Sequence, residues 1–302
     1  MAETSQSLDK PTRLPLRNLI RSYVRLTKPW VLSLLLLTTL ASMMIAAGGL
    51  PPVITMVGTL VGGALTAAGA SAINSFFDAD IDPLMSRTRQ RPVPQSQITP
   101  RSALGFGLWL TAGGLVVLSA TSNMLAAFWA LMGSVVYVFV YTWWLKRSTP
   151  MNIVIGGAAG ALPPLVGWAA VTGETSVLAV YLFMVVLFWT PPHTWALTLM
   201  VQKDYSKANV PMLNVVYGEA ETYRQIMIYL VQLIVVTLLP VAFGLLGWVY
   251  LAGAVALSGV FVVVAVRMWR LRTHAAARVV YKYSQSYLAL LFVMMVIDRW
   301  GM

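Results

Sequence analysis

The chain has 302 residues, of which 58% are hydrophobic and only 10% are charged. Soluble domains carry about 25% charged residues, so this composition excludes an ordinary soluble fold and indicates a membrane protein. The formal net charge of +11 does not indicate nucleic-acid binding, because the basic residues lie in short gaps between apolar runs. The absence of cysteine excludes disulfides, thiolate metal sites and cysteine nucleophiles.

The first 28 residues form a basic segment ahead of the first apolar run. This segment has no apolar core and no small-residue cleavage site, so a cleavable signal peptide is not expected. An arginine-rich transit peptide is the alternative, which Glu3 and Asp9 disfavour. We expect residues 1–28 to be a cytoplasmic segment and residues 29–302 to form one membrane domain.

Nine apolar runs are long enough to cross a membrane as helices, which takes about 20 residues each. The sequence lacks the alternation of a β-barrel, so an all-α, polytopic bundle is expected. The predicted spans are 29–49, 53–77, 103–121, 124–145, 150–171, 176–200, 224–244, 246–266 and 283–299.

The basic residues between these runs predict the orientation of the chain. With nine spans, all of the 21 Lys and Arg residues except Arg299 fall on one side, whereas the turns near 48–52, 121–123, 172–175 and 244–247 carry none. Cationic residues mark the cytoplasmic side, so the N-terminus is predicted to be cytoplasmic and the C-terminus outside. The two long cytoplasmic connections, 78–102 and 201–223, are functional candidates because long loops in compact proteins are usually functional or disordered.

Three polar side chains recur every four residues at the end of the second span, namely Asn74, Asp78 and Asp82. A continuing helix places them on one face, where like charges repel and ionised carboxylates are costly at a membrane boundary. A bound cation offsets this cost, and such oxygen ligands suit Mg²⁺. A solvated acidic loop is the alternative. Asp80 lies on the opposite face and is expected to be structural.

Clusters of cations stand close to this acidic run. Arg87, Arg89 and Arg91 follow it, and the pair Lys146-Arg147 ends the fourth span. Such residues neutralise a substrate with several negative charges, for example a diphosphate. Ordinary anchoring of cytoplasmic helix ends is the alternative for each of them.

The second long connection carries one carboxylate between two lysines. Asp204 lies between Lys203 and Lys207. This arrangement is either a surface ion pair that contributes little or the ligand of a second metal, and the residues alone leave both open.

An ionisable residue lies inside the sixth span, where His193 follows Pro191 and Pro192. Two prolines are expected to break the hydrogen-bond ladder and kink the helix. His193 lies about 16 Å along the helix from Asp204, at a membrane depth where an ionisable residue is a functional candidate. Imidazole is a common iron ligand; a histidine satisfied by a neighbouring helix is the alternative.

The fifth span is rich in small residues from Asn152 to Pro164. Small residues at this spacing allow close helix approach in lipid, so packing is the expected role. Clearance for a large flat ligand is the other reading.

These segments together resemble a known family. The Asn74-x3-Asp78-x3-Asp82 run followed by Arg87-Thr88-x2-Arg91-Pro92 resembles the first aspartate motif of the UbiA superfamily of intramembrane prenyltransferases, and Tyr141-x4-Lys146-Arg147 resembles its basic motif. The segments NIVIGGAAGALPPLVGW from Asn152, PHTWAL from Pro192 and DYSKANVPML from Asp204 are similar to those of one branch, the protohaem IX farnesyltransferases or haem O synthases.

The resemblance implies a reaction in which haem B, farnesyl diphosphate and water give haem O and diphosphate. It implies that Mg²⁺ is held by Asp78 and Asp82 with help from Asn74, and that Asp204 completes the site. It further implies diphosphate contacts from Arg87, Arg91, Lys146, Arg147 and Lys203. We expect His193, from its depth and its proline-rich helix, to act as haem ligand or proton acceptor. Many superfamily members have a second paired-aspartate motif, but Ala208 stands at that spacing here, a feature that haem O synthases share.

The same resemblance implies the bacterial cytoplasmic (inner) membrane, with haem A synthase or oxidase assembly proteins as candidate partners. A prenyltransferase that acts on an aromatic or quinone precursor is the alternative within the superfamily. A transporter for an anionic lipid or metabolite would hold its acids near the bilayer midplane. A passive assembly factor for a respiratory oxidase would tolerate Asp78→Ala without effect.

Overall fold

The computed structural model describes residues 15–301, so the first half of the predicted basic segment lies outside the described residues. Every regular element within 15–301 is helical. In chain order the elements are α1 (Leu16–Leu26), α2 (Pro29–Ala47), α3 (Val53–Phe77), η1 (Asp82–Leu84), α4 (Pro100–Thr121), α5 (Met124–Val135), η2 (Val136–Leu145), α6 (Lys146–Ser148), α7 (Asn152–Gly156), α8 (Ala158–Ala161), α9 (Pro163–Thr172), α10 (Val177–Met200), α11 (Gln202–Lys207), α12 (Leu213–Val216), α13 (Gly218–Ala242), α14 (Trp248–Leu271) and α15 (His274–Trp300).

Over the described residues, nine helical segments are long and apolar enough to span a membrane, which confirms the predicted helix count. Two of them are composite: α5, η2 and α6 form the fourth, and α7, α8 and α9 form the fifth. The seventh and ninth begin several residues earlier than predicted, at Gly218 and His274. Glu219 and Glu221 in the first turn of α13 complement the helix dipole, and the Thr273 side chain caps α15. Because both helices begin with polar residues, hydropathy alone predicted their starts several residues too late.

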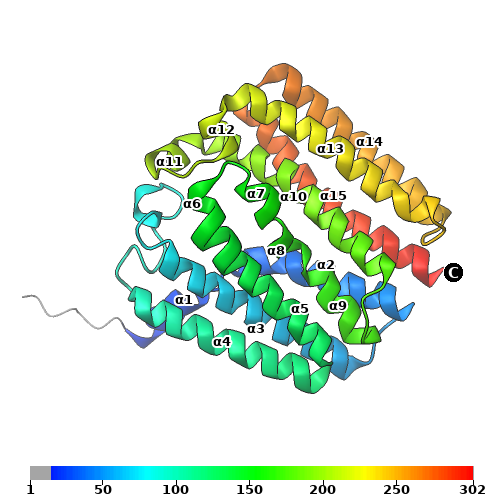
Figure 1. The fold of residues 1–302 in the computed structure, drawn as a ribbon, viewed down its shortest axis with the longest axis horizontal. Helices are drawn as coiled ribbons and strands as arrows, with labels where there is room; N and C mark the ends of the chain where they lie inside the picture. The colour runs from blue at the N-terminus through cyan, green and yellow to red at the C-terminus, as the bar shows by residue number, and fades with distance from the viewer. Residues whose placement is uncertain (1–14, 302) are drawn as a thin grey trace, which may run out of the picture.

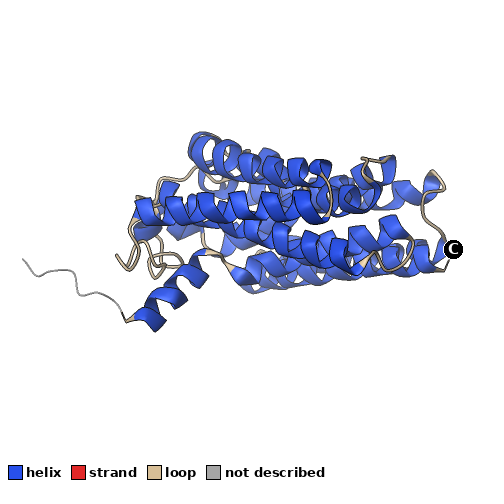
Figure 2. Ribbon diagram, turned by 90° about the horizontal axis from the view of Figure 1, so that it is seen from below, coloured by secondary structure: helices blue, strands red, loops and turns tan. Residues whose placement is uncertain are grey.

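The long helices run side by side, and the two long connections meet at one end of the bundle. Figure 1 shows the loop after α3 beside α11 and α12, at the end opposite the C-terminus. Figure 2 shows the bundle from the side, with α1 projecting obliquely at this same end. The two segments that carry the predicted acidic residues, 78–102 and 201–217, therefore lie close together.

Glycines hold α3 and α4 in close contact. A Cβ added to Gly69 would lie 2.5 Å from the carbonyl oxygen of Gly107, and one added to Gly114 would lie 2.6 Å from that of Gly62. Small residues allow such close backbone approach between helices in lipid. This packing fixes the helix that ends at the acidic run.

Prolines and glycines act differently from expectation in the fifth and sixth spans. α10 continues through the buried Pro191 and Pro192, so the two prolines, which lack the N–H groups for the hydrogen-bond ladder, do not end the helix. Membrane helices tolerate proline where neighbouring groups satisfy the freed carbonyls. The interrupted span is instead the fifth, where the chain breaks at Gly157 and again at Leu162, before Pro163 starts α9.

Candidate active site

Asp78 is the centre of a buried polar cluster at the end of α3. Its Oδ2 accepts a hydrogen bond from Asn74 Nδ2 at 2.8 Å and from Lys146 Nζ at 2.7 Å. Asp78 is 1% exposed and Lys146 is 6% exposed. The other carboxylate oxygen, Asp78 Oδ1, is buried and has no hydrogen-bond partner among the described residues. A buried acceptor without a partner is unfavourable, so this atom is open to a cation.

Asp82 lies one turn further on, where the helix has ended but its winding persists. The Asp82 N–H donates to the Asp78 carbonyl at 2.9 Å, so the two carboxylates keep their four-residue spacing beyond α3. Both oxygens of Asp82 accept from Arg91 NH1, at 3.0 and 2.9 Å. Thr88 Oγ1 donates to the Asp82 carbonyl at 2.8 Å, which folds the arginine-bearing loop back over the acids.

Lys28 joins this cluster, although the sequence indicated only an anchoring cation there. Its Nζ donates to Asn74 Oδ1 at 2.6 Å and to Tyr137 OH at 3.3 Å. The residue adopts a left-handed conformation (φ +52°) just before Pro29 starts α2, and this turn aims the side chain inward. Burial, followed by the nearby charge of Arg91, lowers the pKa of Lys28 to about 7. A lysine directly before a helix-starting proline was the only sequence signal for this role.

A π-helix brings the basic motif to the acids. Across η2 the hydrogen bonds span five residues instead of four, so residues five apart share a face. Thr142 Oγ1 donates to the Tyr137 carbonyl, five residues back, at 2.8 Å, and accepts from Asn74 Nδ2 at 3.1 Å. By the same spacing Tyr141 and Lys146 fall on one face, whereas on an α-helix they would be about 140° apart. Thr142 is a site residue that the sequence did not identify.

Arg147 does not lie on the face that carries Lys146; it pairs with Asp80 instead. Its guanidinium donates to both oxygens of Asp80 at 2.6 and 2.7 Å and to the Phe77 carbonyl at 2.6 Å. The hydrogen bond from Arg147 holds the pKa of Asp80 below its ordinary value. The structure thus places the two basic residues of the motif apart: Lys146 lies at Asp78 and Arg147 at the exposed Asp80.

Asp204 connects the two loops. Both of its oxygens lie within hydrogen-bond distance of Ser86 Oγ, at 2.8 and 2.7 Å, and Oδ2 accepts from the Arg87 N–H at 3.3 Å. Partial burial acts to raise the pKa of Asp204, but the hydrogen bonds from Ser86 and Arg87 hold it below its ordinary value. Arg87 NH2 also donates to Tyr205 OH at 3.3 Å, and Lys203 is exposed nearby.

The three predicted metal ligands are not assembled into one cluster. Within residues 15–301, no group of three or more His, Cys, Asp or Glu side chains is arranged to hold a metal ion. Asp78 and Asp82 lie together, while Asp204 is bound to the first loop through Ser86.

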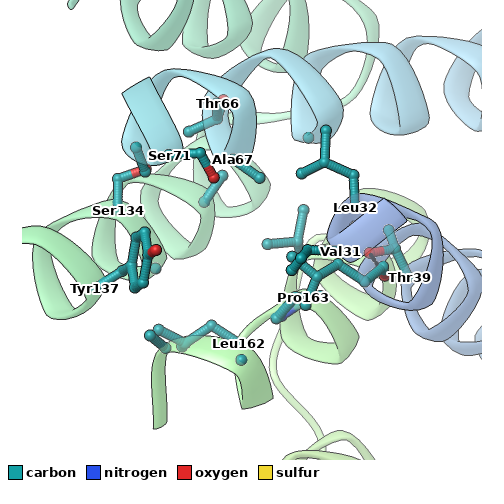
Figure 3. A pocket seen from close by; sticks show the side chains of 18 of the residues that line it. Val31, Leu32, Thr39, Thr66, Ala67, Ser71, Ser134, Tyr137, Leu162 and Pro163 are labelled. Atoms are coloured by element: carbon teal, nitrogen blue, oxygen red, sulfur yellow. Dashed lines mark hydrogen bonds between the residues drawn. The ribbon is translucent and has the colours of Figure 1, made fainter. Parts of the chain in front are cut away.

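An apolar cavity of about 350 Å³ lies beside the polar cluster, and Tyr137 and Tyr141 line it. Figure 3 shows Tyr137 and Ser134 facing Leu32 and Val31 of α2 across this space. The two tyrosine rings stack with centroids 6.1 Å apart. The cavity is otherwise lined by α3, by the glycine-rich fifth span and by Thr190 and Thr194 of α10.

Two glycines of the fifth span have different surroundings. A Cβ added to Gly156 would lie within 3.0 Å of the Tyr141 side chain, so this glycine allows close packing. Gly160 also lines the cavity, but a Cβ there would meet no atom within 4 Å, so Gly160 leaves space open.

His193 lies on α10 between two aromatic rings, and it is not among the residues that line the cavity. Trp189 stacks on one side with centroids 4.2 Å apart, and Tyr281 on the other at 4.7 Å. Its Nδ1 lies 2.7 Å from Ser284 Oγ on α15.

The polar cluster and the cavity form a site with two parts. One part holds buried carboxylates, an unpartnered oxygen and the cations Lys28, Arg91 and Lys146. The adjoining part is apolar and has the two tyrosines at the junction. Such a site suits a molecule with an anionic head and an apolar tail, and a divalent cation can join the two negative partners.

Comparison with known proteins gives a consistent result. The model of the UbiA prenyltransferase family matches residues 35–293. A relative from Chloroflexus aurantiacus, named protoheme IX farnesyltransferase, is 53% identical over 94% of this chain and 48% of its own length. One of the same name from Granulibacter bethesdensis is 45% identical over 97% of this chain and 95% of its own length. The chain thus spans about half the length of the Chloroflexus relative and nearly all of the Granulibacter one.

Solved structures show the same fold at low sequence identity. A structure described in work on digeranylgeranylglyceryl phosphate synthase matches with a TM-score of 0.77 and 18% identity, over 94% of this chain and 100% of that chain. A UbiA homologue from Archaeoglobus fulgidus bound to GPP and Mg²⁺ matches with a TM-score of 0.66 and 16% identity, over 91% and 99%. Residues 35–293 include the acidic run, the basic motif and most of the residues that line the cavity. The chain belongs to the UbiA prenyltransferase family.

Proposed function

We propose that the protein transfers the farnesyl group of farnesyl diphosphate to haem B, with addition of water, to give haem O and diphosphate. The relatives named protoheme IX farnesyltransferase support this substrate pair. The structural observation that carries the proposal is Asp78 Oδ1, a buried carboxylate oxygen without a partner among the described residues, in a cluster with cations. Tyr137, which contacts Lys28 of this cluster, lines the apolar cavity.

Asp78 and Asp82 fit a Mg²⁺ ion. Asp78 offers a free buried oxygen, and Asp82 offers two oxygens now shared with Arg91. Hard oxygen ligands from one or two carboxylates leave positions for waters and phosphate oxygens. Asp204 would complete the site from the second loop after leaving Ser86. The bound ion would neutralise charge on the diphosphate as it leaves.

The protein's own cations hold the same leaving group. Lys146 and Arg91 pair with the carboxylates that the diphosphate approaches, and Lys28 is held beside them by Asn74. Arg87 and the exposed Lys203 lie on the two loops. Fixed positive groups aimed at developing negative charge stabilise the transition state. Arg147 belongs to the predicted contacts as well, and reaches the diphosphate only if it leaves Asp80.

The cavity beside these charges would hold the farnesyl chain. Cleavage of the C1–O bond leaves an allylic cation, which a vinyl group of haem B attacks; water then adds to the resulting cation and releases a proton. Tyr137 and Tyr141 line the cavity, and an aromatic face turned towards the allylic cation would stabilise it. The apolar lining excludes bulk water until the new bond has formed.

His193 is proposed to contact the haem, as its axial ligand or as the acceptor of the released proton. An imidazole within a membrane-spanning helix is a functional candidate by default. If His193→Ala leaves both the haem spectrum and the turnover unchanged, this role is refuted.

We further propose that the loop end of the bundle faces the cytoplasm of a bacterial inner membrane. The concentration of Lys and Arg in the loops at this end supports the orientation. Haem A synthase or oxidase assembly proteins are candidate partners, because haem O must pass to a later enzyme without entering water.

The decisive experiment is mass spectrometry of haem extracted after the pure protein is incubated with haem B, farnesyl diphosphate and Mg²⁺. We expect haem O, and we expect chelation of divalent ions or Asp78→Asn to abolish it. A parallel incubation with 4-hydroxybenzoate tests an aromatic prenyltransferase. Prenylated 4-hydroxybenzoate without haem O would refute the proposal, as would haem O formation unaffected by Asp78→Asn.

A further inference from the structure

The imidazole of His193 can form polar contacts only in the plane of its ring. Trp189 covers one face with its ring tilted by 18°, and Tyr281 covers the other with a tilt of 26°. Two in-plane nitrogens therefore remain, Nδ1 towards Ser284 and Nε2 on the opposite edge.

The hydrogen bonds of Ser284 determine which nitrogen carries the proton. A hydroxyl has one hydrogen to donate, and Ser284 Oγ donates it to the Tyr281 carbonyl at 2.8 Å. The oxygen can then only accept from His193 Nδ1, which lies 2.7 Å away. Trp189 Nε1 donates to the Ser284 carbonyl at 2.7 Å and ties the same turn of α15 to α10. With the Ser284 hydrogen on the Tyr281 carbonyl, the matching tautomer of His193 carries its proton on Nδ1 and presents a lone pair on Nε2.

Nε2 is available to a ligand. Within residues 15–301 it makes no hydrogen bond. It is also not one of the fully buried polar atoms without a partner, such as Trp195 Nε1, so part of its surface is accessible. Thr194, the next residue on the helix, lines the apolar cavity, whereas His193 does not.

We propose that Ser284 is a positioning residue that holds His193 as the Nδ1–H tautomer, so that Nε2 coordinates the iron of haem B. Histidines that bind metals almost always donate their other ring N–H to a fixed acceptor, which sets the tautomer and the ring orientation. Ser284 is that acceptor, and the stack of Trp189 and Tyr281 fixes the ring plane. This assignment rests on the proposed haem substrate.

Nitrogen-15 NMR tests the tautomer without any substrate. The chain has two histidines, so the His274→Gln variant, changed at an exposed position, leaves the signals of His193 alone. We expect a protonated Nδ1 and an unprotonated Nε2, and a shift of the Nε2 signal on addition of haem B. The Ser284→Ala variant should populate the other tautomer, whereas Ser286→Ala, at an exposed position of the same helix, should not.

Absorption titration with haem B tests the coordination. We expect an imidazole-ligated spectrum that His193→Ala loses, and an affinity about 10- to 100-fold weaker in Ser284→Ala but unchanged in Ser286→Ala. The assignment would be overturned if Nε2 were protonated in the protein that carries only His274→Gln. It would also be overturned if the two serine variants had equal haem spectra and equal haem affinities. If the tautomer and the ligation are as expected but haem O never forms, the proposed reaction fails and the role of Ser284 stands.

Discussion

The ion pair between Lys146 and Asp78 gives the sharpest test of the polar cluster. Replacing Lys146 with Met keeps a long apolar stem but removes the charge that Asp78 Oδ2 meets at 2.7 Å. Both residues are at least nine-tenths buried, so water cannot take the place of the lost ammonium group. The variant therefore leaves a buried carboxylate with one amide donor, Asn74, and one unpartnered oxygen.

Breaking a buried pair by removing one partner costs about 3–5 kcal/mol. Because Asp78 Oδ1 already has no partner, we expect Lys146→Met to fall in the upper part of this range. Asp78→Asn should be destabilising too, whereas the double variant removes both charges and should be much closer to the parent protein. Mg²⁺ should partly rescue Lys146→Met, since a ligand at 100 times its dissociation constant adds about 2.7 kcal/mol.

The assay is unfolding by SDS titration in mixed micelles, followed by circular dichroism for the parent, both single variants and the double variant. The cycle should show a coupling of about 0.5–3 kcal/mol, as for residues in direct contact. Mg²⁺ should stabilise Lys146→Met but not the variants that lack Asp78. Additive single effects below about 1 kcal/mol, or equal Mg²⁺ stabilisation of all four proteins, would refute the described charge arrangement.

Three further outcomes follow from the site. Gly160→Leu should fill the open part of the cavity and lower the rate of farnesyl transfer by about tenfold or more. The control Gly105→Leu, at an exposed glycine of α4, should leave the rate unchanged. Equal rates for the two variants would show that the farnesyl group binds elsewhere. Lys28 has a pKa lowered to about 7 from 10.5, so between these values the unfolded chain binds the proton that the folded protein has released. The free energy of unfolding should therefore rise with pH across this window, and SDS titrations should show that Lys28→Met removes the rise. Arg147→Gln disrupts a solvent-exposed ion pair with Asp80, so kcat/KM should change by less than about threefold. If steady-state kinetics instead showed a loss of kcat/KM as large as that in Arg91→Gln, Arg147 would contact the diphosphate.

The helices could be predicted from the sequence because each one carries its own signal. A run of apolar residues is local information, and all nine spans are present in the described chain. The helix starts at Gly218 and His274 were missed because polar residues can extend a helix beyond the membrane.

The candidate site could be predicted only where its residues are neighbours in the sequence. Asn74, Asp78 and Asp82 lie on adjacent turns, and the structure keeps them together. Lys28 joins them through a left-handed turn, and Ser284 reaches His193 across 91 residues. Contacts of this kind depend on tertiary packing, so they cannot be predicted from the spacing of residues along the sequence.

Lys146 and Arg147 show the same limit in adjacent residues. Both are basic residues at a helix end, yet one is buried at Asp78 and the other is half-exposed at Asp80. Adjacent residues point about 100° apart on a regular helix, and which of the two meets Asp78 depends on how this helix end packs against α3, which the sequence pattern does not include.

The wide winding of η2 also limits how the motif can be transplanted. A designer who copied Tyr141 and Lys146 at their natural spacing onto a regular helix would turn the lysine away from the tyrosine by more than a third of a revolution, so that the ammonium group faced lipid. Retaining the motif in an engineered bundle requires either the same over-wide turn or a spacing shortened to four residues.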